Sequence, residues 1–198
     1  DVTSTSYPQV TEPPVTSEEP QVTQPPVTDP PQEEKEWIYY ACDGEIYLGV
    51  TETTNGGFTG PSYVNYDNVT GSMLTFTVNV PSEGNYEMTV RFANGTETAR
   101  PLNIYLNGSQ ENYSMDFGGT GAWTSWQENK IVLPLKNGEN KIKTVAVTSN
   151  GGPNVDYIKL VKTDKEAASV NTNTVIPYEP PVSANAKQME RLDRGLIS

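Results

Sequence analysis

The chain has 198 residues, with 25 acidic and 13 basic side chains for a formal net charge of −12, one Cys and no His. Without histidine there is no Ser-His-Asp triad and no His-ligated zinc, and a single cysteine cannot close a disulfide within the chain. The acidic balance argues against nucleic-acid binding, which needs clustered Lys and Arg, whereas carboxylate chemistry and calcium, which takes oxygen ligands, remain open.

Residues 1–36 are predicted to be a Pro/Thr-rich spacer. They hold eight of the 16 prolines and eight acids against one Lys, so −7 of the net charge lies here. A twelve-residue repeat, PQVTEPPVTSEE and then PQVTQPPVTDPP, begins at Pro8 and again at Pro20. Such sequence has too little apolar surface to offset the entropy of ordering, and its prolines favour extended polyproline II. A peptide ligand for a proline-recognising partner is the alternative.

Residues 37–162 are predicted to be an all-β domain. Apolar residues alternate with polar ones over 74–80, 86–92 and 102–106, which indicates strands with one buried face. Gly and Asn turn signals separate these runs at regular intervals, and no helical period longer than two turns occurs in this region. Short, evenly spaced strands favour a β-sandwich of the jelly-roll type.

Residues 55–66, NGGFTGPSYVNY, form a glycine-rich aromatic loop. Its glycines are not a phosphate cradle, because neither a helix nor a Gly-Lys-Ser/Thr sequence follows. Tyr63 and Tyr66 are candidates for an aromatic face toward a ligand. Alternatively, either ring seals the edge of the sandwich.

Arg91 and Arg100 are two of only four arginines in the chain. Arg100 follows the turn 94–99 and precedes Pro101, which places it at a loop end where its guanidinium can hold a carboxylate. An ordinary surface ion pair is the alternative.

Two tryptophans stand three residues apart in the segment 121–126, so they cannot point the same way on one strand. Trp126 leads into the alternating segment 127–133 and is assigned to the core. Trp123 lies beside Gly121 and is assigned to a loop, where its ring can form a platform. The alternative is that both rings are buried.

Residues 151–157, GGPNVDY, form a tight loop that leads into the last strand. Asn154 offers a donor and an acceptor together, the pairing needed to hold vicinal sugar hydroxyls, although a turn residue bonded to its own backbone fits the spacing equally well. Asp156 alternates with the apolar Val155 and would be costly inside a sandwich unless it is paired or bound to metal. An aromatic platform, an amide and a cation together indicate sugar recognition.

Residues 163–187 are predicted to be a second linker, with a Pro-rich patch at 177–181. The chain contains no apolar run of membrane-spanning length and does not begin like a signal peptide. We therefore expect a module cut from a longer, secreted bacterial protein, with no membrane or nucleic-acid partner.

The domain at 37–162 resembles the family 35 carbohydrate-binding modules, which are relatives of the family 6 modules. The resemblance implies a sugar site in the loops at one end of the sandwich, with Trp123 stacking on the sugar, Asn154 bonding to its hydroxyls and Tyr63 or Tyr66 as the opposing ring. Several such modules bind uronic acids beside a calcium ion, where Arg100 would assist. The matching segments are YYACDGE (39–45), GFTGPSYV (57–64), LTFTVNVP (74–81), YEMTVRFANG (86–95), ARPLNIYLNG (99–108), GTGAWTSW (119–126), residues 135–142 and GGPNVDYIKL (151–160).

The resemblance fails at one point. The first strand of the family usually reads YEAED, and its two glutamates bind a structural calcium together with the aspartate of a final NxD motif. Tyr40 and Cys42 stand at those positions here, and a hard cation would choose neither. Asp156 is retained, and Asp43 or Glu45 compensates only if the strand register shifts. We therefore expect this calcium site to be weakened, altered or absent, with Tyr40 and Cys42 filling the space.

Residues 188–198, QMERLDRGLIS, are similar to the opening segment of the family 11 polysaccharide lyases, the rhamnogalacturonan lyases. This second resemblance implies that 188–198 begin a truncated catalytic domain. A pectin lyase leaves unsaturated galacturonate at chain ends, which a uronate-binding module would hold.

The sequence therefore predicts a non-catalytic, monomeric module that targets an attached pectin-degrading enzyme to plant cell wall polysaccharide through glucuronate or unsaturated galacturonate. One alternative is a module for a neutral polysaccharide such as mannan or galactan. Another is a structural or adhesion domain. A third is a carboxylate-pair hydrolase, but no spacing places two carboxyls across one cleft; the acids considered are Asp67, Glu97, Asp116 and Glu128.

Overall fold

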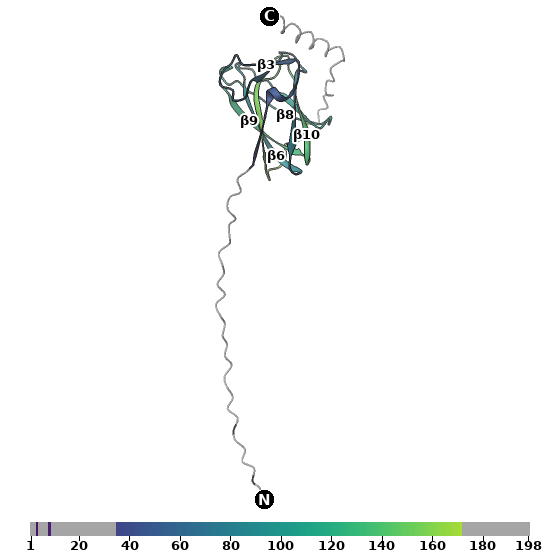
Figure 1. The fold of residues 1–198 in the computed structure, drawn as a ribbon. Helices are drawn as coiled ribbons and strands as arrows, with labels where there is room; N and C mark the ends of the chain where they lie inside the picture. The colour runs from purple at the N-terminus through teal and green to yellow at the C-terminus, as the bar shows by residue number, and fades with distance from the viewer. Residues whose placement is uncertain (1–2, 4–7, 9–34, 172–198) are drawn as a thin grey trace. The chain divides into compact units, whose positions relative to one another are not determined.

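The computed structural model describes residues 3, 8 and 35–171 (Figure 1). The chain divides into two units, Asp1–Glu33 and Glu34–Ser198, and all described strands belong to the second. Nearly all of the predicted spacer 1–36 lies outside the described residues, as do the Pro-rich patch at 177–181 and the lyase-like segment 188–198. Within the described residues, no helix is long and apolar enough to cross a membrane.

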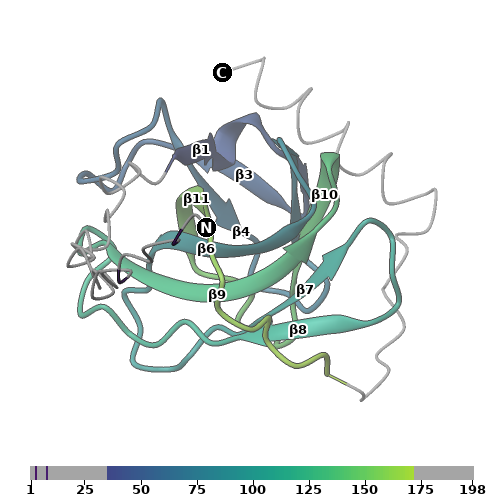
Figure 2. The ribbon, with the colours of Figure 1, turned by 90° about the horizontal axis from the view of Figure 1, so that it is seen from below.

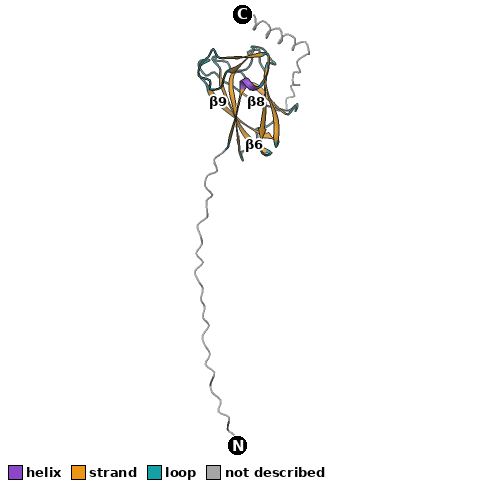
Figure 3. Cartoon of the chain, in the orientation of Figure 1, coloured by secondary structure: helices purple, strands orange, loops and turns teal. Residues whose placement is uncertain are grey.

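The second unit is a sandwich of two antiparallel sheets (Figures 1 and 2). One sheet has the order β3-β4-β11-β6-β9, and β1 also pairs with β11; the other has the order β2-β5-β10-β7-β8. Figure 3 shows strands and loops with a single short helical turn, η1 (Ala41–Asp43), in the described part. The strands of the first sheet are β1 (Glu36–Tyr40), β3 (Gly49–Glu52), β4 (Tyr63–Tyr66), β6 (Gly84–Ala93), β9 (Gln127–Leu135) and β11 (Asn154–Lys162). Those of the second are β2 (Glu45–Tyr47), β5 (Met73–Val80), β7 (Leu102–Leu106), β8 (Asn112–Met115) and β10 (Gly138–Ala146).

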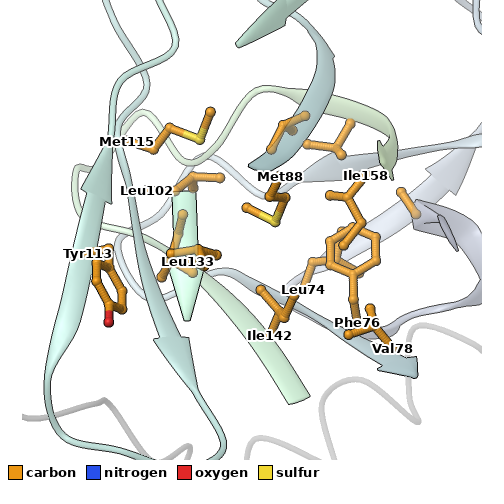
Figure 4. Close-up of a cluster of buried hydrophobic side chains, with 14 of the residues drawn as sticks. Leu74, Phe76, Val78, Met88, Leu102, Tyr113, Met115, Leu133, Ile142 and Ile158 are labelled. Atoms are coloured by element: carbon orange, nitrogen blue, oxygen red, sulfur yellow. The ribbon is translucent and has the colours of Figure 1, made fainter. Parts of the chain in front are cut away.

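The hydrophobic core lies between the two sheets and follows the alternation in the sequence (Figure 4). Along β5 the apolar side chains of Leu74, Phe76 and Val78 are at most 2 % exposed, while the intervening threonines face outward or are half-buried. Period-two alternation places one set of side chains on the inner face of each sheet, where their burial stabilises the fold. The predicted all-β sandwich is confirmed.

Strand β11 is the central strand of the first sheet and carries a bulge. It pairs with β1 and β4 on one side and with β6 on the other, and its register against β6 shifts between Val155 and Tyr157. A bulge inserts an extra residue and bends the strand. Asn154, Val155 and Asp156 are consequently all buried at the end of β11 where the loops meet.

Residues 163–171 pack against the sandwich, so the described fold extends past the predicted boundary at 162. The amide of Thr163 donates to the carbonyl of Asn85 at 2.9 Å, and the amide of Ala168 donates to the carbonyl of Val132 at 2.9 Å. Asn171 then forms a bridge with Asn112 on β8. The segment therefore runs from the first sheet to the edge of the second.

Candidate functional site

A cavity of about 180 Å³ opens among the loops at the Asn154 end of the sandwich. Its wall has four amides, one guanidinium and one indole, and no carboxylate side chain; the lining residues are Asn55, Asn65, Asn68, Arg100, Trp123 and Asn154. A larger hollow of about 570 Å³ lies at the opposite end, among the turns near Gly84, Asn107 and Lys136, and none of the predicted site residues lines it. The loop-end cavity thus brings together three predicted residues and three that the sequence reasoning missed.

Trp123 lies in the loop between β8 and β9, and its ring is half-buried in the cavity wall. The guanidinium carbon of Arg100 lies 5.0 Å from the centroid of the ring. Gly95 allows this placement, because a Cβ on it would stand 2.4 Å from Cδ1 of Trp123. The indole is therefore held in a fixed position with part of its surface open, although its role as a sugar platform stays a prediction.

Arg100 is a buried cation, only 7 % exposed, that lines the cavity. Its Nη1 donates to Oδ1 of Asn68 at 2.9 Å, to the carbonyl of Gly152 at 3.1 Å and to the carbonyl of Asn150. It forms no ion pair with any acid in the described part of the chain, and its buried Nε has no hydrogen-bond partner. Burial lowers the pKa of this guanidinium by penalising its charged form. The surface ion pair considered from the sequence is not found.

Asn154 opens β11 and is 2 % exposed. Its buried Oδ1 accepts no hydrogen bond. Leaving such an acceptor unpaired costs about 1–3 kcal/mol, and this oxygen does not form the local bond to its own backbone that was considered as the alternative. Asn154 and Arg100, which both line the cavity, thus each carry one buried polar atom without a hydrogen-bond partner.

The three asparagines that the sequence reasoning missed line the same wall. Asn65 lies on β4 between the buried Val64 and Tyr66, so strict alternation turns it away from the core, and this signal was available in the sequence. Asn55 is held by a hydrogen bond from its Nδ2 to the hydroxyl of Tyr63 at 2.8 Å. Asn68 follows β4 and resembles any other turn asparagine in the sequence.

The structure corrects the expectation that Tyr63 or Tyr66 faces the ligand. Tyr63 is completely buried, and its ring packs against Phe58 and Trp126 with centroids 5.5 and 5.4 Å away. Tyr66 is 2 % exposed in the core, and its hydroxyl is 2.6 Å from Oγ1 of Thr144. Neither ring lines the cavity, because each fills space inside the fold.

The assignment of Trp126 to the sandwich core is also corrected. The residue precedes β9, so the alternation of that strand does not extend to it. Its half-buried ring lies under the loop 55–60 instead, and its Nε1 donates to the carbonyl of Gly56 at 2.9 Å. Trp126 thus supports the loop that carries Asn55.

Asp156 is completely buried and is paired with Arg91, whose Nη1 donates to its Oδ2. The same oxygen accepts from the amide and the hydroxyl of Thr59 at 2.8 and 2.9 Å, and Oδ1 accepts from the amide of Gly60 at 3.1 Å. The requirement that a buried aspartate be paired or metal-bound is met here by an arginine and a loop backbone.

The predicted calcium ligands Asp156, Asp43 and Glu45 do not come together. Asp43 is exposed in η1, while Glu45 is exposed on β2 in the other sheet and pairs with Lys141 at 2.9 Å. Among the described residues, no group of three Asp, Glu, Cys or His could hold a metal ion. A calcium ion needs six or more oxygen ligands, so these residues do not fit the metal site of the resemblance.

The two residues that replace the expected glutamates lie at the start of the domain. Tyr40 is half-buried and makes an edge contact with Tyr157, with centroids 6.5 Å apart. Its ring also lies against Gly60, where a Cβ would stand 2.6 Å from Cδ1 of Tyr40. Cys42 is a free, half-buried thiol. Tyr40 therefore packs as expected, while Cys42 is less buried than expected.

Four acids were considered for a hydrolase, and none of them lines the cavity; they are Asp67, Glu97, Asp116 and Glu128. Glu128 instead accepts a hydrogen bond from the hydroxyl of Tyr157 at 2.7 Å on the outer face of the sheet. A glycosidase of the usual kind needs two carboxyls across one cleft, and none of these four acids is among the described residues that line this cavity.

A β-sandwich with a loop-end cavity of amides, a guanidinium and an indole has the side-chain types expected of a sugar-binding module. The chain belongs to the carbohydrate-binding module family 6, whose model matches residues 40–162. Modules of this class bind carbohydrate and are non-catalytic.

Two enzymes are similar to part of the chain. An exo-β-D-glucosaminidase of Amycolatopsis orientalis is 50 % identical over 122 residues, which are 62 % of this chain and 12 % of that protein. Endo-1,4-β-xylanase B of Cellvibrio japonicus is 34 % identical over 114 residues, 57 % of this chain and 19 % of the enzyme. The chain thus spans less than a fifth of the length of these relatives.

Solved structures of family 35 modules share the fold. A family 35 module from Clostridium thermocellum is 46 % identical with a TM-score of 0.62, and the match covers 65 % of this chain and 99 % of that module. A family 35 module described as Xyl-CBM35 in complex with a glucuronic acid containing disaccharide is 30 % identical with a TM-score of 0.60, covering 67 % of this chain and 97 % of that one.

Proposed function

We propose that this module binds uronic acid residues of plant cell wall polysaccharide, glucuronate or the unsaturated galacturonate of cleaved pectin. The observation that carries the proposal is Arg100, a buried guanidinium of the cavity lining that pairs with no acid of the described chain. A buried charge is costly unless a counter-charge reaches it, and a sugar carboxylate supplies one.

The other cavity groups match the rest of a sugar ring. The indole of Trp123 offers an apolar surface for the C–H face of a pyranose, and the amide of Asn154 offers a donor and an acceptor for its hydroxyls. The absence of carboxylate side chains from the lining means that no like charge opposes an anionic sugar. The similar module solved with a glucuronic acid containing disaccharide supports the same ligand class.

The wider role of the parent protein is part of the proposal. The lyase-like segment 188–198 and the Pro/Thr-rich sequence favour a secreted, pectin-degrading enzyme of the rhamnogalacturonan lyase type, to which the module is tethered as a monomer. A tethered module raises the effective concentration of its catalytic partner on the polymer, even when the affinity of one small sugar site is modest.

Titration calorimetry of the chain with D-glucuronate, unsaturated galacturonate, D-glucose and rhamnogalacturonan oligosaccharides tests the ligand class. We expect glucuronate to bind at least about tenfold more tightly than glucose, because a charge-assisted hydrogen bond contributes about 1.5–3 kcal/mol. Repeating the titration with calcium and with a chelator tests the ion expected beside a uronate carboxylate. No heat with any uronate would refute the proposal.

The amides in the cavity favour a second candidate, a neutral polysaccharide such as mannan or galactan, because amides alone can hold hydroxyl groups. Equal affinity for glucose, mannose and glucuronate would support this candidate. Trp123→Ala separates both from an adhesion domain, since it should abolish sugar binding of either kind and would leave an adhesion function unchanged.

A further inference from the structure

The ion pair between Arg91 and Asp156 lies beside the cavity and lines no part of it. We propose that Arg91 is a positioning residue: its guanidinium supplies at Asp156 the positive charge that holds the loop 55–60 in its binding form, so that no metal ion is required at this aspartate. The effect on sugar affinity rests on the proposed function, whereas the absence of a metal requirement at Asp156 does not.

The carboxylate of Asp156 is buried and already has hydrogen-bond donors on both oxygens. Its side chain is 0 % exposed, and both of its oxygens already accept hydrogen bonds from Arg91, Thr59 and Gly60. A calcium ion at this carboxylate would have to displace the guanidinium and would find neither Asp43 nor Glu45 within the same group of ligands. The arginine thus neutralises the buried charge from within the chain.

Arg91 also binds the loop directly. Its Nη2 donates to the carbonyl of Gly57 at 2.9 Å, and its guanidinium carbon lies 5.4 Å from the centroid of Trp126. Gly57 has a φ of +94°, and a Cβ there would stand 3.0 Å from Cδ1 of Trp126, so only glycine lets the loop approach the ring this closely. One guanidinium therefore contacts the strand, the loop and the ring beneath the loop.

The ion pair links two segments that carry cavity residues. Asn55, at the start of this loop, and Asn154, two residues before Asp156 on β11, both line the cavity. The bulge between Val155 and Tyr157 lies opposite Arg91, which pairs with Tyr157 across the sheet. Removing the guanidinium would leave only the hydrogen bonds of Thr59 and Gly60 between the loop and Asp156, so the position of Asn55 relative to Asn154 would be less firmly held.

Arg91→Met removes the charge and retains a long side chain, while Lys159→Met is the matched control. Lys159 lies on the same sheet and pairs with Glu36 at 3.0 Å, away from the loop. We expect Arg91→Met to weaken glucuronate binding by at least tenfold in calorimetry and Lys159→Met to change it by less than twofold. Arg91→Lys should recover part of the affinity. Equal effects of both methionine variants would overturn the positioning role.

Because Arg91→Met leaves a buried carboxylate without its cation and so destabilises the fold, the double variant Arg91→Met with Asp156→Asn is measured as well. It removes the unpaired charge, so its melting temperature should recover while its affinity stays low. A double variant with native affinity would contradict the proposal.

A measurement without any sugar tests separately whether Asp156 requires a metal ion. In the native chain, calcium added to millimolar concentration should leave the amide resonances of Thr59 and Gly60 in place, and a chelator should not change them. In Arg91→Met the exchange of these two amides with solvent should accelerate at least tenfold. Shifts of both amides in the native chain on calcium addition would overturn the inference, whereas failure of every sugar to bind would refute the proposed function and leave this result standing.

Discussion

Replacing Arg100 by methionine removes the one charge that the cavity presents to a ligand. The methionine retains much of the apolar stem, so the change tests the guanidinium and not the volume. A hydrogen bond to a charged group contributes about 1.5–3 kcal/mol, and about 1.4 kcal/mol corresponds to a factor of ten, so glucuronate affinity should fall about 10- to 100-fold.

The same variant also loses the bonds of Arg100 to Asn68 and to the carbonyls of Asn150 and Gly152, which hold Arg100 to the two loops 67–72 and 147–153. Affinity for D-glucose is therefore the internal control. Loosened loops would weaken the binding of both sugars, whereas a lost carboxylate contact would weaken the binding of glucuronate alone. Calorimetry with both sugars gives the selectivity ratio. A ratio that is unchanged in Arg100→Met would refute the assignment of the guanidinium to a carboxylate.

Three further predictions concern other parts of the domain. Gly95→Ala should weaken every sugar ligand in calorimetry, because its Cβ would clash with the indole of the cavity at 2.4 Å; unchanged affinity would show that the ring position is unimportant. Hydrogen bonds from Lys130 and Lys165 lower the pKa of Glu87. Because the folded-state pKa is lowered, the ionised Glu87 stabilises the fold above its unfolded pKa of about 4.3, and this stabilisation is lost as the pH falls through the folded-state pKa. Glu87→Gln should therefore lower the melting temperature at about pH 7 and have no effect near pH 2. Leu133→Ala, at a completely buried position, should lower the free energy of unfolding by about 2–5 kcal/mol in denaturant titration and leave sugar affinity unchanged.

The sheets were accessible from the sequence because alternation is local: the pattern of Leu74, Phe76 and Val78 already specifies which face is buried. Arg100 and Trp123 were identified by residue type and by neighbouring turn residues, and they meet in one cavity.

Other parts of the site depend on contacts between distant segments. The burial of Tyr63 is set by Trp126, which lies far along the chain and folds under the same loop. Asp156 and Arg91 are 65 residues apart, and only the pairing of β11 with β6 brings them together. No local pattern of residues encodes such a meeting, so the sequence left the choice between a metal and an arginine open.

Glu36 and Asn171, near the two ends of the described domain, lie away from the cavity. Glu36 pairs with Val161 near the far end of β11, and Asn171 pairs with Asn112, opposite Tyr105 of β7, whereas the cavity lies at the Asn154 end. Strand β11 has nine residues and so spans roughly 30 Å. Neither end of the described domain obstructs the cavity. A sugar bound in the cavity would therefore lie at the opposite end of the described sandwich from Glu36 and Asn171.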